Sequence, residues 1–236
     1  MKTSFLSILI LFVFVFSGIR VNADEQERNV DSFSEISLRV SGNLYLTQGD
    51  KQHVEIVAKA SVLDEIITEV KDRKLIIRFP NKNYFWKNFE SGKITIYVTV
   101  PEIDALSVSG SGDIIAEDAI NTRILDMAVS GSGDIKLSEL KADRVKVAVS
   151  GSGDVMIKGK ETATDLSVAI SGSGNLRAID FPAEDVVVKV SGSGNCSVHA
   201  QSKLTIRVAG SGDVVYRGHP QIDKSVVGSG SVRNVD

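Results

Sequence analysis

Along most of the chain, hydrophobic residues occupy every second position over short stretches. Leu125, Met127 and Val129, for example, alternate with Asp126 and Ala128. Successive side chains of a β-strand point to opposite faces, so a period of two predicts strands with one buried face. The same alternation returns in Val145, Val147, Val149; Leu166, Val168, Ile170; Val186, Val188, Val190; and Leu204, Ile206, Val208. The intervening positions, which include Lys146, Ser167, Lys189 and Arg207, are expected to face water.

Each predicted strand runs into one short phrase, Ser-Gly-Ser-Gly-Asp or a close copy. The phrase first spans 109–113 and returns at intervals of 18–21 residues, ending at Asp134, Asp154, Asn175, Asn195, Asp213 and Ser231. A second short apolar pair follows each copy, such as Ile135 and Leu137. A period of this length indicates one small unit that is stacked repeatedly. The sequence therefore predicts an all-β fold: a single parallel β-helix, or solenoid, with right-handed winding and coils of about 20 residues.

The glycines of the phrase are expected to form the corner between the two strands of each coil. Glycine takes positive φ without steric cost, and serine, Asp and Asn side chains can hydrogen-bond the backbone amides of a turn. The predicted structural corner residues are Gly110, Gly112, Gly131, Gly133, Gly151, Gly153, Gly172, Gly174, Gly192, Gly194, Gly210 and Gly212.

The chain divides into a leader and one domain. Lys2, an apolar run over 5–16 and small residues before Asp24 predict a signal peptide over 1–23. The run is too short for a membrane-spanning helix, and no later stretch could span, so we expect export to the periplasm, the cell surface or the medium. Residues 24–236 are expected to form one β-helix domain, with regular repeats over 102–236.

The part over 24–101 lacks the regular period and is expected to cap the N-terminal end of the solenoid. Val40 to Leu44 contains a shortened copy of the phrase. We expect strands near 53–58, 74–79 and 93–100, one helical turn within 61–70 and a hairpin turn at 71–74. A cap is needed because the end of a solenoid otherwise exposes apolar residues and open strand edges.

Charge and cysteine content narrow the classes of partner. Removing the leader leaves 25 basic and 30 acidic residues, a net charge of −5 without a basic block, which argues against nucleic acid as a partner. Cys196 is the lone cysteine and occupies the repeat position held elsewhere by Ile135 and Leu176. We therefore expect a buried small hydrophobic residue rather than a nucleophile or ligand.

A secreted chain with serial Val-Ser-Gly-Ser-Gly-Asp-Ile/Val phrases at this spacing resembles the auto-transporter adhesin head GIN domain family, which is common in Bacteroidetes and of unknown function. The resemblance covers about 30–233. It implies a β-helical fold and an extracytoplasmic location. The adhesin label of that family rests on shape analogy, which says little about the ligand.

Stacked coils would align the acidic ends of the phrase in one stripe. Asp113, Asp134 and Asp154 would lie about 5 Å apart and give way to Asn175 and Asn195. Closely spaced carboxylates repel unless screened, protonated or bridged by a cation such as calcium. Asn at two positions favours the alternative, in which each side chain caps its own turn. We therefore expect no metal and no cofactor, with the three aspartates as the weak candidates.

A second candidate is an aromatic cluster made of Tyr84, Phe85, Trp86 and Phe89. Exposed rings of this kind stack on sugars or anchor protein partners. The alternative is that they cover the open end of the solenoid. We name them as the candidate binding residues.

Catalysis has little support. The three histidines lack metal-ligand spacing, no Gly-x-Ser-x-Gly elbow occurs, and no Arg or Lys is seen to recur beside the acidic stripe. We therefore expect a non-catalytic, adhesin-like protein of the cell envelope that presents a rigid surface to an unknown glycan or surface protein. The alternatives are a structural protein that self-assembles through its coil ends into a homo-oligomer, and a carbohydrate-active β-helix enzyme.

Overall fold

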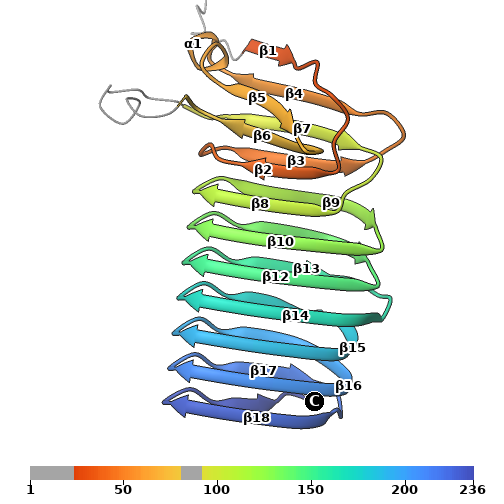
Figure 1. Cartoon of the computed structure of the whole chain (residues 1–236), viewed down its shortest axis with the longest axis vertical. Helices are drawn as coiled ribbons and strands as arrows, with labels where there is room; N and C mark the ends of the chain where they lie inside the picture. The colour runs from red at the N-terminus through yellow and green to blue at the C-terminus, as the bar shows by residue number, and fades with distance from the viewer. Residues whose placement is uncertain (1–23, 81–91) are drawn as a thin grey trace, which may run out of the picture.

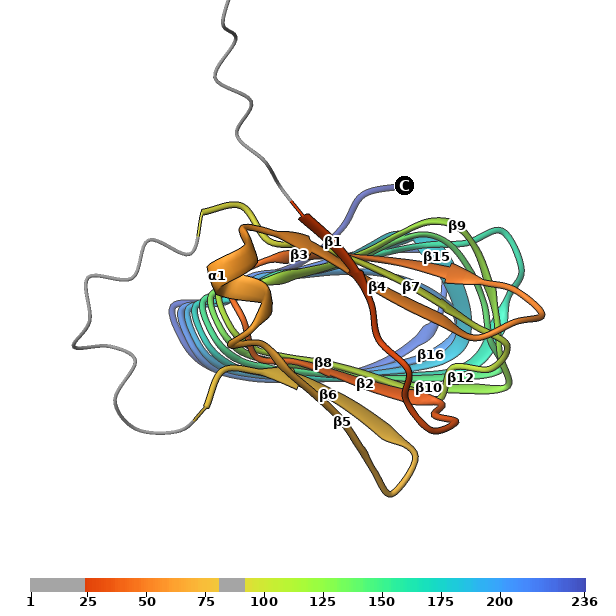
Figure 2. The ribbon, with the colours of Figure 1, turned by 90° about the horizontal axis from the view of Figure 1, so that it is seen from above.

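The computed structural model describes residues 24–80 and 92–236, which form strands coiled around one axis (Figure 1). Seen from above, the coils trace a flattened oval with two long faces (Figure 2). The first face holds β8 (Ala105–Gly110), β10 (Ile124–Gly131), β12 (Arg144–Gly151), β14 (Ala163–Gly172) and β18 (Gln221–Gly228). The second holds β9 (Asp113–Asn121), β11 (Ile135–Lys141), β13 (Val155–Lys158), β17 (Val214–Arg217) and β19 (Val232–Asn234). The long strands β15 (Leu176–Gly192) and β16 (Cys196–Gly210) pair with strands of both faces.

Equivalent strands of successive coils pair in parallel, and on the first face they do so almost without a shift in register. Val129 lies opposite Val149, which lies opposite Ile170, and the same column continues through Val190 and Val208. Each of these side chains is at most 3% exposed. Burial of one such side chain contributes about 1.5–3 kcal/mol, so the inward columns stabilise the whole solenoid. The predicted parallel β-helix is confirmed.

The N-terminal part adds antiparallel strands to the solenoid. Its elements are β1 (Asp24–Glu27), β2 (Glu35–Leu38), β3 (Asn43–Gln48), β4 (His53–Ala58), α1 (Ala60–Leu63), β5 (Ile67–Lys71), β6 (Lys74–Arg78) and β7 (Thr95–Val100). The strands, the single helical turn and the hairpin expected here are all present. The β5–β6 hairpin turns at Asp72 and Arg73, whose φ angles of 51° and 62° match a tight two-residue turn. No helix in the described ranges is long and apolar enough to cross a membrane.

The shortened phrase at 40–44 belongs to the first coil. Asn43 lies opposite Asp113, while β2 and β3 pair in parallel with β8 and β9. On their other side, β2 and β3 pair with β6 and β7. Beyond these, β4 is antiparallel to both β1 and β7, and β1, β4 and α1 lie over the N-terminal end (Figure 1).

The coil formed by β18 and β19 lies at the opposite end and is far less covered. Ile222 and Val226 continue inward columns, yet they are 39% and 37% exposed, whereas their neighbours Leu204 and Val208 are buried. Lys224 lies opposite Ile206, so a charged residue takes a core position in this coil. An inward-pointing charge discourages another strand from pairing at such an edge.

Candidate functional site

The corners have two kinds of glycine with different physical roles. The first glycine of each phrase has φ between 118° and 137°, a region that residues with a Cβ rarely adopt. The second has no positive φ, contrary to the expectation that both bend the chain. A Cβ there would overlap the preceding coil: at Gly133 it would collide with the carbonyl oxygen of Gly112. The second glycine is therefore needed for close stacking between coils.

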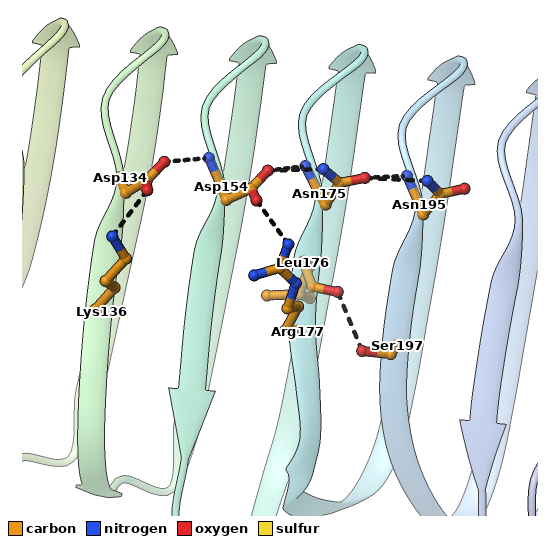
Figure 3. Close-up of polar contacts among 8 residues, drawn as sticks. All are labelled: Asp134, Lys136, Asp154, Asn175, Leu176, Arg177, Asn195 and Ser197. Carbon is orange, nitrogen blue, oxygen red and sulfur yellow. Dashed lines mark hydrogen bonds and ion pairs between the residues drawn. The ribbon is translucent and has the colours of Figure 1, made fainter.

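The side chain that ends each phrase reaches across to the next coil. Asp134 N–H donates to Asp113 Oδ1 at 3.0 Å. In the following coils, Asp154 N–H donates to Asp134 Oδ1 at 2.9 Å and Asn175 N–H donates to Asp154 Oδ1 at 3.0 Å (Figure 3). The pattern continues through Asn195, Asp213 and Ser231. We call this column the corner ladder: Asp113, Asp134, Asp154, Asn175, Asn195, Asp213 and Ser231. Its bonds connect neighbouring coils, whereas the sequence predicted that each side chain would cap its own turn.

Basic side chains of the protein itself screen the acidic half of the corner ladder. Lys136 Nζ lies 2.9 Å from Asp134 and 3.8 Å from Asp113, and an Arg177 guanidinium nitrogen lies 3.2 Å from Asp154 Oδ2. The hydrogen bond to Asp134 raises the pKa of Lys136, despite some burial of the ammonium group. The expectation that no basic residue accompanies the stripe is wrong. The described residues contain no cluster of three or more metal-ligating side chains.

The other half of the ladder consists of Asn175, Asn195, Asp213 and Ser231. Its two amide side chains keep unused N–H donors. Asn175 Nδ2 donates to Asp154 Oδ1 at 2.7 Å, and Asn195 Nδ2 donates to Asn175 Oδ1 at 3.1 Å. An amide nitrogen has two N–H groups, so one on each side chain has no partner among the described residues. The Ser231 hydroxyl donates to Asp213 Oδ1 at 2.7 Å and, together with the Ser231 N–H, lowers the pKa of Asp213.

A shallow cleft of about 480 Å³ lies beside this half of the ladder. It is lined by polar groups of four successive coils and a few apolar ones: Asn175, Leu176, Arg177, Asn195, Cys196, Ser197, Asp213, Val215 and Arg233. We call it the ladder cleft. Arg177, Ser197, Val215 and Arg233 are consecutive partners across strands, so the two guanidinium groups stand at opposite ends of one column. Sequence analysis missed both arginines.

Cys196 contributes its backbone to this cleft but not a reactive thiol. Its side chain is 1% exposed and continues the inward column between Leu176 and Val214. Burial raises the pKa of its thiol to about 12. The predicted role as a small buried hydrophobic residue is confirmed.

The first face of the solenoid carries a larger groove of about 580 Å³. Half of the residues that line it are alanine or serine. Lys189 and Arg207 line it in two successive coils, and Val227, which is 71% exposed, borders it. No aromatic or acidic side chain lines it. The candidate binding residues Tyr84, Phe85, Trp86 and Phe89 lie outside the described residues.

The described site thus joins a rigid polar ladder to a cleft with both donors and acceptors. Arg177, which lines the cleft, also forms an ion pair with Asp154 of the acidic half of the ladder (Figure 3). Ser197 Oγ donates to the carbonyl oxygen of Leu176 at 3.3 Å. Backbone hydrogen bonds between coils hold these side chains on strands, so the cleft needs little rearrangement to receive a ligand.

Solved structures share this architecture. A "putative adhesin" from Bacteroides fragilis has a TM-score of 0.81 and 27% identity, covering 91% of this chain and 98% of that one. A "putative lipid binding protein" from Parabacteroides distasonis has a TM-score of 0.74 and 25% identity, covering 92% and 98%. A "putative adhesin" from Parabacteroides merdae, at 22% identity and a TM-score of 0.71 over the same shares, supports the fold alone. No curated protein sequence matches the chain.

A family model described as "Putative auto-transporter adhesin, head GIN domain" matches residues 32–220. That range begins just before the first coil and ends just before β18, so it contains the corner ladder up to Asp213. The match spans most of the chain and agrees with the resemblance that the repeated phrase suggests. The chain therefore belongs to the auto-transporter adhesin head GIN domain family.

Proposed function

We propose that this protein is a non-catalytic, adhesin-like binding protein of the cell envelope and that a glycan lies in the ladder cleft. The observation that carries the proposal is the set of unused polar groups held there in fixed positions. Asn175 and Asn195 each offer an N–H, and Asp213 Oδ2 accepts no hydrogen bond from any described residue. A sugar hydroxyl both donates and accepts, so it requires mixed groups of this kind.

The cleft suits a glycan better than the groove on the first face. That groove is lined almost entirely by apolar surface, so it offers few hydrogen-bonding groups to sugar hydroxyls. The ladder also repeats at the strand spacing of about 4.8 Å, comparable to the length that one pyranose adds to a chain. A glycan laid along the solenoid axis would therefore meet equivalent groups in successive coils.

A binding role fits the chemistry of the ladder better than hydrolysis. A glycosidase needs one carboxylate as base or nucleophile and a second that holds a proton near neutral pH. Here the carboxylates of Asp134 and Asp154 accept backbone hydrogen bonds and pair with Lys136 and Arg177, so both are already engaged by groups of the protein itself. Family membership is consistent with an adhesin-like, extracytoplasmic protein, and we propose export through the leader over 1–23.

The apolar groove supports a second candidate, the binding of an acyl chain. Its apolar lining and the exposed Val227 offer contact area, and Lys189 supplies a positive charge for a carboxylate headgroup, whereas Arg207 is already paired with Asp223 at 2.6 Å. The Parabacteroides distasonis relative, whose description reads "putative lipid binding protein", gives this alternative a further argument. Competition with a fluorescent fatty acid, using Val227→Ser, distinguishes it from glycan binding.

The proposed function is tested with a glycan array and envelope extracts. The wild-type chain is compared with Asn195→Ala, which alters the cleft, and with Trp86→Ala/Phe89→Ala, which tests the aromatic cluster. Released reducing sugar is assayed in parallel. We expect glycan binding that Asn195→Ala weakens, without sugar release. Sugar release abolished by Asp134→Ala would establish the enzyme instead, and the absence of any glycan binding would refute the proposal.

A further inference from the structure

The two arginines of the ladder cleft keep unused hydrogen-bond donors, and the strands hold their backbone positions a fixed distance apart. Arg177 and Arg233 are three strand steps apart in one column, which corresponds to about 14 Å along the axis. Arg177 uses one guanidinium nitrogen for Asp154 and remains 58% exposed. Arg233 makes neither a hydrogen bond nor an ion pair with any of the described residues, although its charge is close enough to lower the pKa of Asp213. A guanidinium carries five N–H donors in a planar fork that matches a carboxylate, so both heads can take an anionic partner.

The surface between the arginines has the opposite character. Ser197 and Val215 separate them in the column, and Asp213 stands beside Val215 at the corner of the same coil. The Asp213 carboxylate is ionised at neutral pH like any ordinary Asp, and its hydrogen bonds to Ser231, together with the charge of Arg233, lower its pKa further. A carboxylate placed over this middle section would be repelled, whereas a neutral sugar could donate a hydroxyl hydrogen bond to Asp213 Oδ2.

We propose that the ladder cleft takes an acidic glycan whose negatively charged sugars are separated by neutral ones. This inference rests on the proposed glycan-binding function and specifies the class of glycan. One acidic sugar lies at Arg177, another lies at Arg233, and neutral sugar lies over Ser197 and Asp213. Positive charge at both ends of the cleft orients the glycan along the solenoid axis. The negative Asp213 between them sets the spacing of the acidic groups of the glycan.

Binding is measured by titration calorimetry on the full purified chain with three probes. The first is a tetrasaccharide with a uronate at each end and two neutral sugars between them, so its acidic groups are three sugars apart, as the arginines are three strand steps apart. Polygalacturonate is acidic at every residue, and dextran is neutral. We expect the tetrasaccharide to bind more tightly than polygalacturonate, and dextran not to bind. High salt should weaken binding of the tetrasaccharide, because partly exposed ion pairs are screened.

The decisive variants are Arg233→Gln and Arg177→Gln, each expected to weaken binding of the tetrasaccharide by about tenfold or more, because each removes charged hydrogen bonds. Lys146→Gln is the matched control: it removes one exposed positive charge on the opposite face and should bind like wild type. Arg233 makes no hydrogen bond or ion pair within the described fold, and its attraction to Asp213 acts at an exposed site, so its variant is expected to keep a melting temperature close to that of the wild type.

The other outcomes overturn the inference in distinguishable ways. Equal loss in Arg233→Gln and Lys146→Gln would mean that only net charge matters. Tighter binding of polygalacturonate would refute the neutral centre. A third outcome is binding of dextran or another neutral glycan, weakened by Asn195→Ala but unchanged in Arg233→Gln. It would refute an acidic glycan as the ligand, while the proposed glycan-binding function would stand.

Discussion

A Cβ atom on Gly133 would overlap the carbonyl oxygen of Gly112 in the preceding coil. The backbones of successive corners are therefore in direct contact, with no side chain between them. Ser132 and Gly133 both donate their N–H groups to the Gly110 carbonyl oxygen, at 2.8 and 3.0 Å. This contact explains why the second glycine of the phrase is as constant as the first, although only the first has positive φ.

Two alanine substitutions separate strain from overlap. Gly110 has φ of 118° and an ideal Cβ there meets no atom within 4 Å, so Gly110→Ala should cost only the strain of its backbone, about 1–3 kcal/mol. Gly133→Ala should cost more, about 4 kcal/mol or above, because neighbouring backbone must move. Denaturant unfolding of both variants measures the difference. Equal costs would show that coil contact at Gly133 is unimportant.

The corner ladder predicts a difference between two substitutions of Asp154. Asp154→Asn keeps an Oδ1 that accepts the Asn175 N–H and loses only the exposed pair with Arg177, so it should cost less than about 1 kcal/mol. Asp154→Ala leaves that part-buried N–H without its acceptor and should cost about 1–3 kcal/mol. Urea unfolding measures both values. Stability of the Ala variant equal to that of the Asn variant would mean that the ladder bond does not stabilise the fold.

Calcium is expected to leave the melting temperature unchanged. The carboxylates of Asp113 and Asp134 already face Lys136, which supplies the positive charge that a cation would otherwise bring. A ligand that binds only the folded state must raise its stability. A saturable rise in melting temperature with calcium, lost in Asp134→Asn, would contradict this prediction and revive the metal site.

The sequence predicted the solenoid because each coil repeats the same requirement: apolar residues at alternate positions, then a corner. The sequence also predicted that a glycine is needed at 133, but for the wrong reason. A Cβ there would overlap Gly112, which lies 21 positions earlier, and this contact cannot be seen within one phrase. The basic residues beside the ladder were missed for a related reason. Lys136, Arg177 and Arg233 each lie two positions after the residue that ends the phrase, but other coils have Met156 or Val215 there. Alternation in a strand places that position on the outer face beside the ladder, so the period of two could have predicted basic side chains there.

Cys196 should resist thiol reagents in the folded protein. Burial both blocks access to its sulfur and raises the pKa of its thiol to about 12, so the reactive thiolate is scarce at neutral pH. We expect Ellman's reagent to label it only after unfolding, with a labelling rate that follows the opening of the coil. Rapid labelling without denaturant would show that this coil opens readily or that the thiol is accessible.

Lys224 is expected to keep the coil of β18 from pairing with other chains. It lies opposite Ile206 in an inward column, between the half-exposed Ile222 and Val226, and only β16 pairs with β18 among the described strands. Replacing the charge with an apolar side chain would make this edge a continuous hydrophobic template. Lys224→Val should therefore associate with rising concentration in sedimentation or light-scattering measurements, while Lys203→Val, on the outer face of β16, should behave like wild type. The alternative function, self-assembly through coil ends, predicts a different result. The wild-type chain would already oligomerise, and Lys224→Val would change its oligomeric state little.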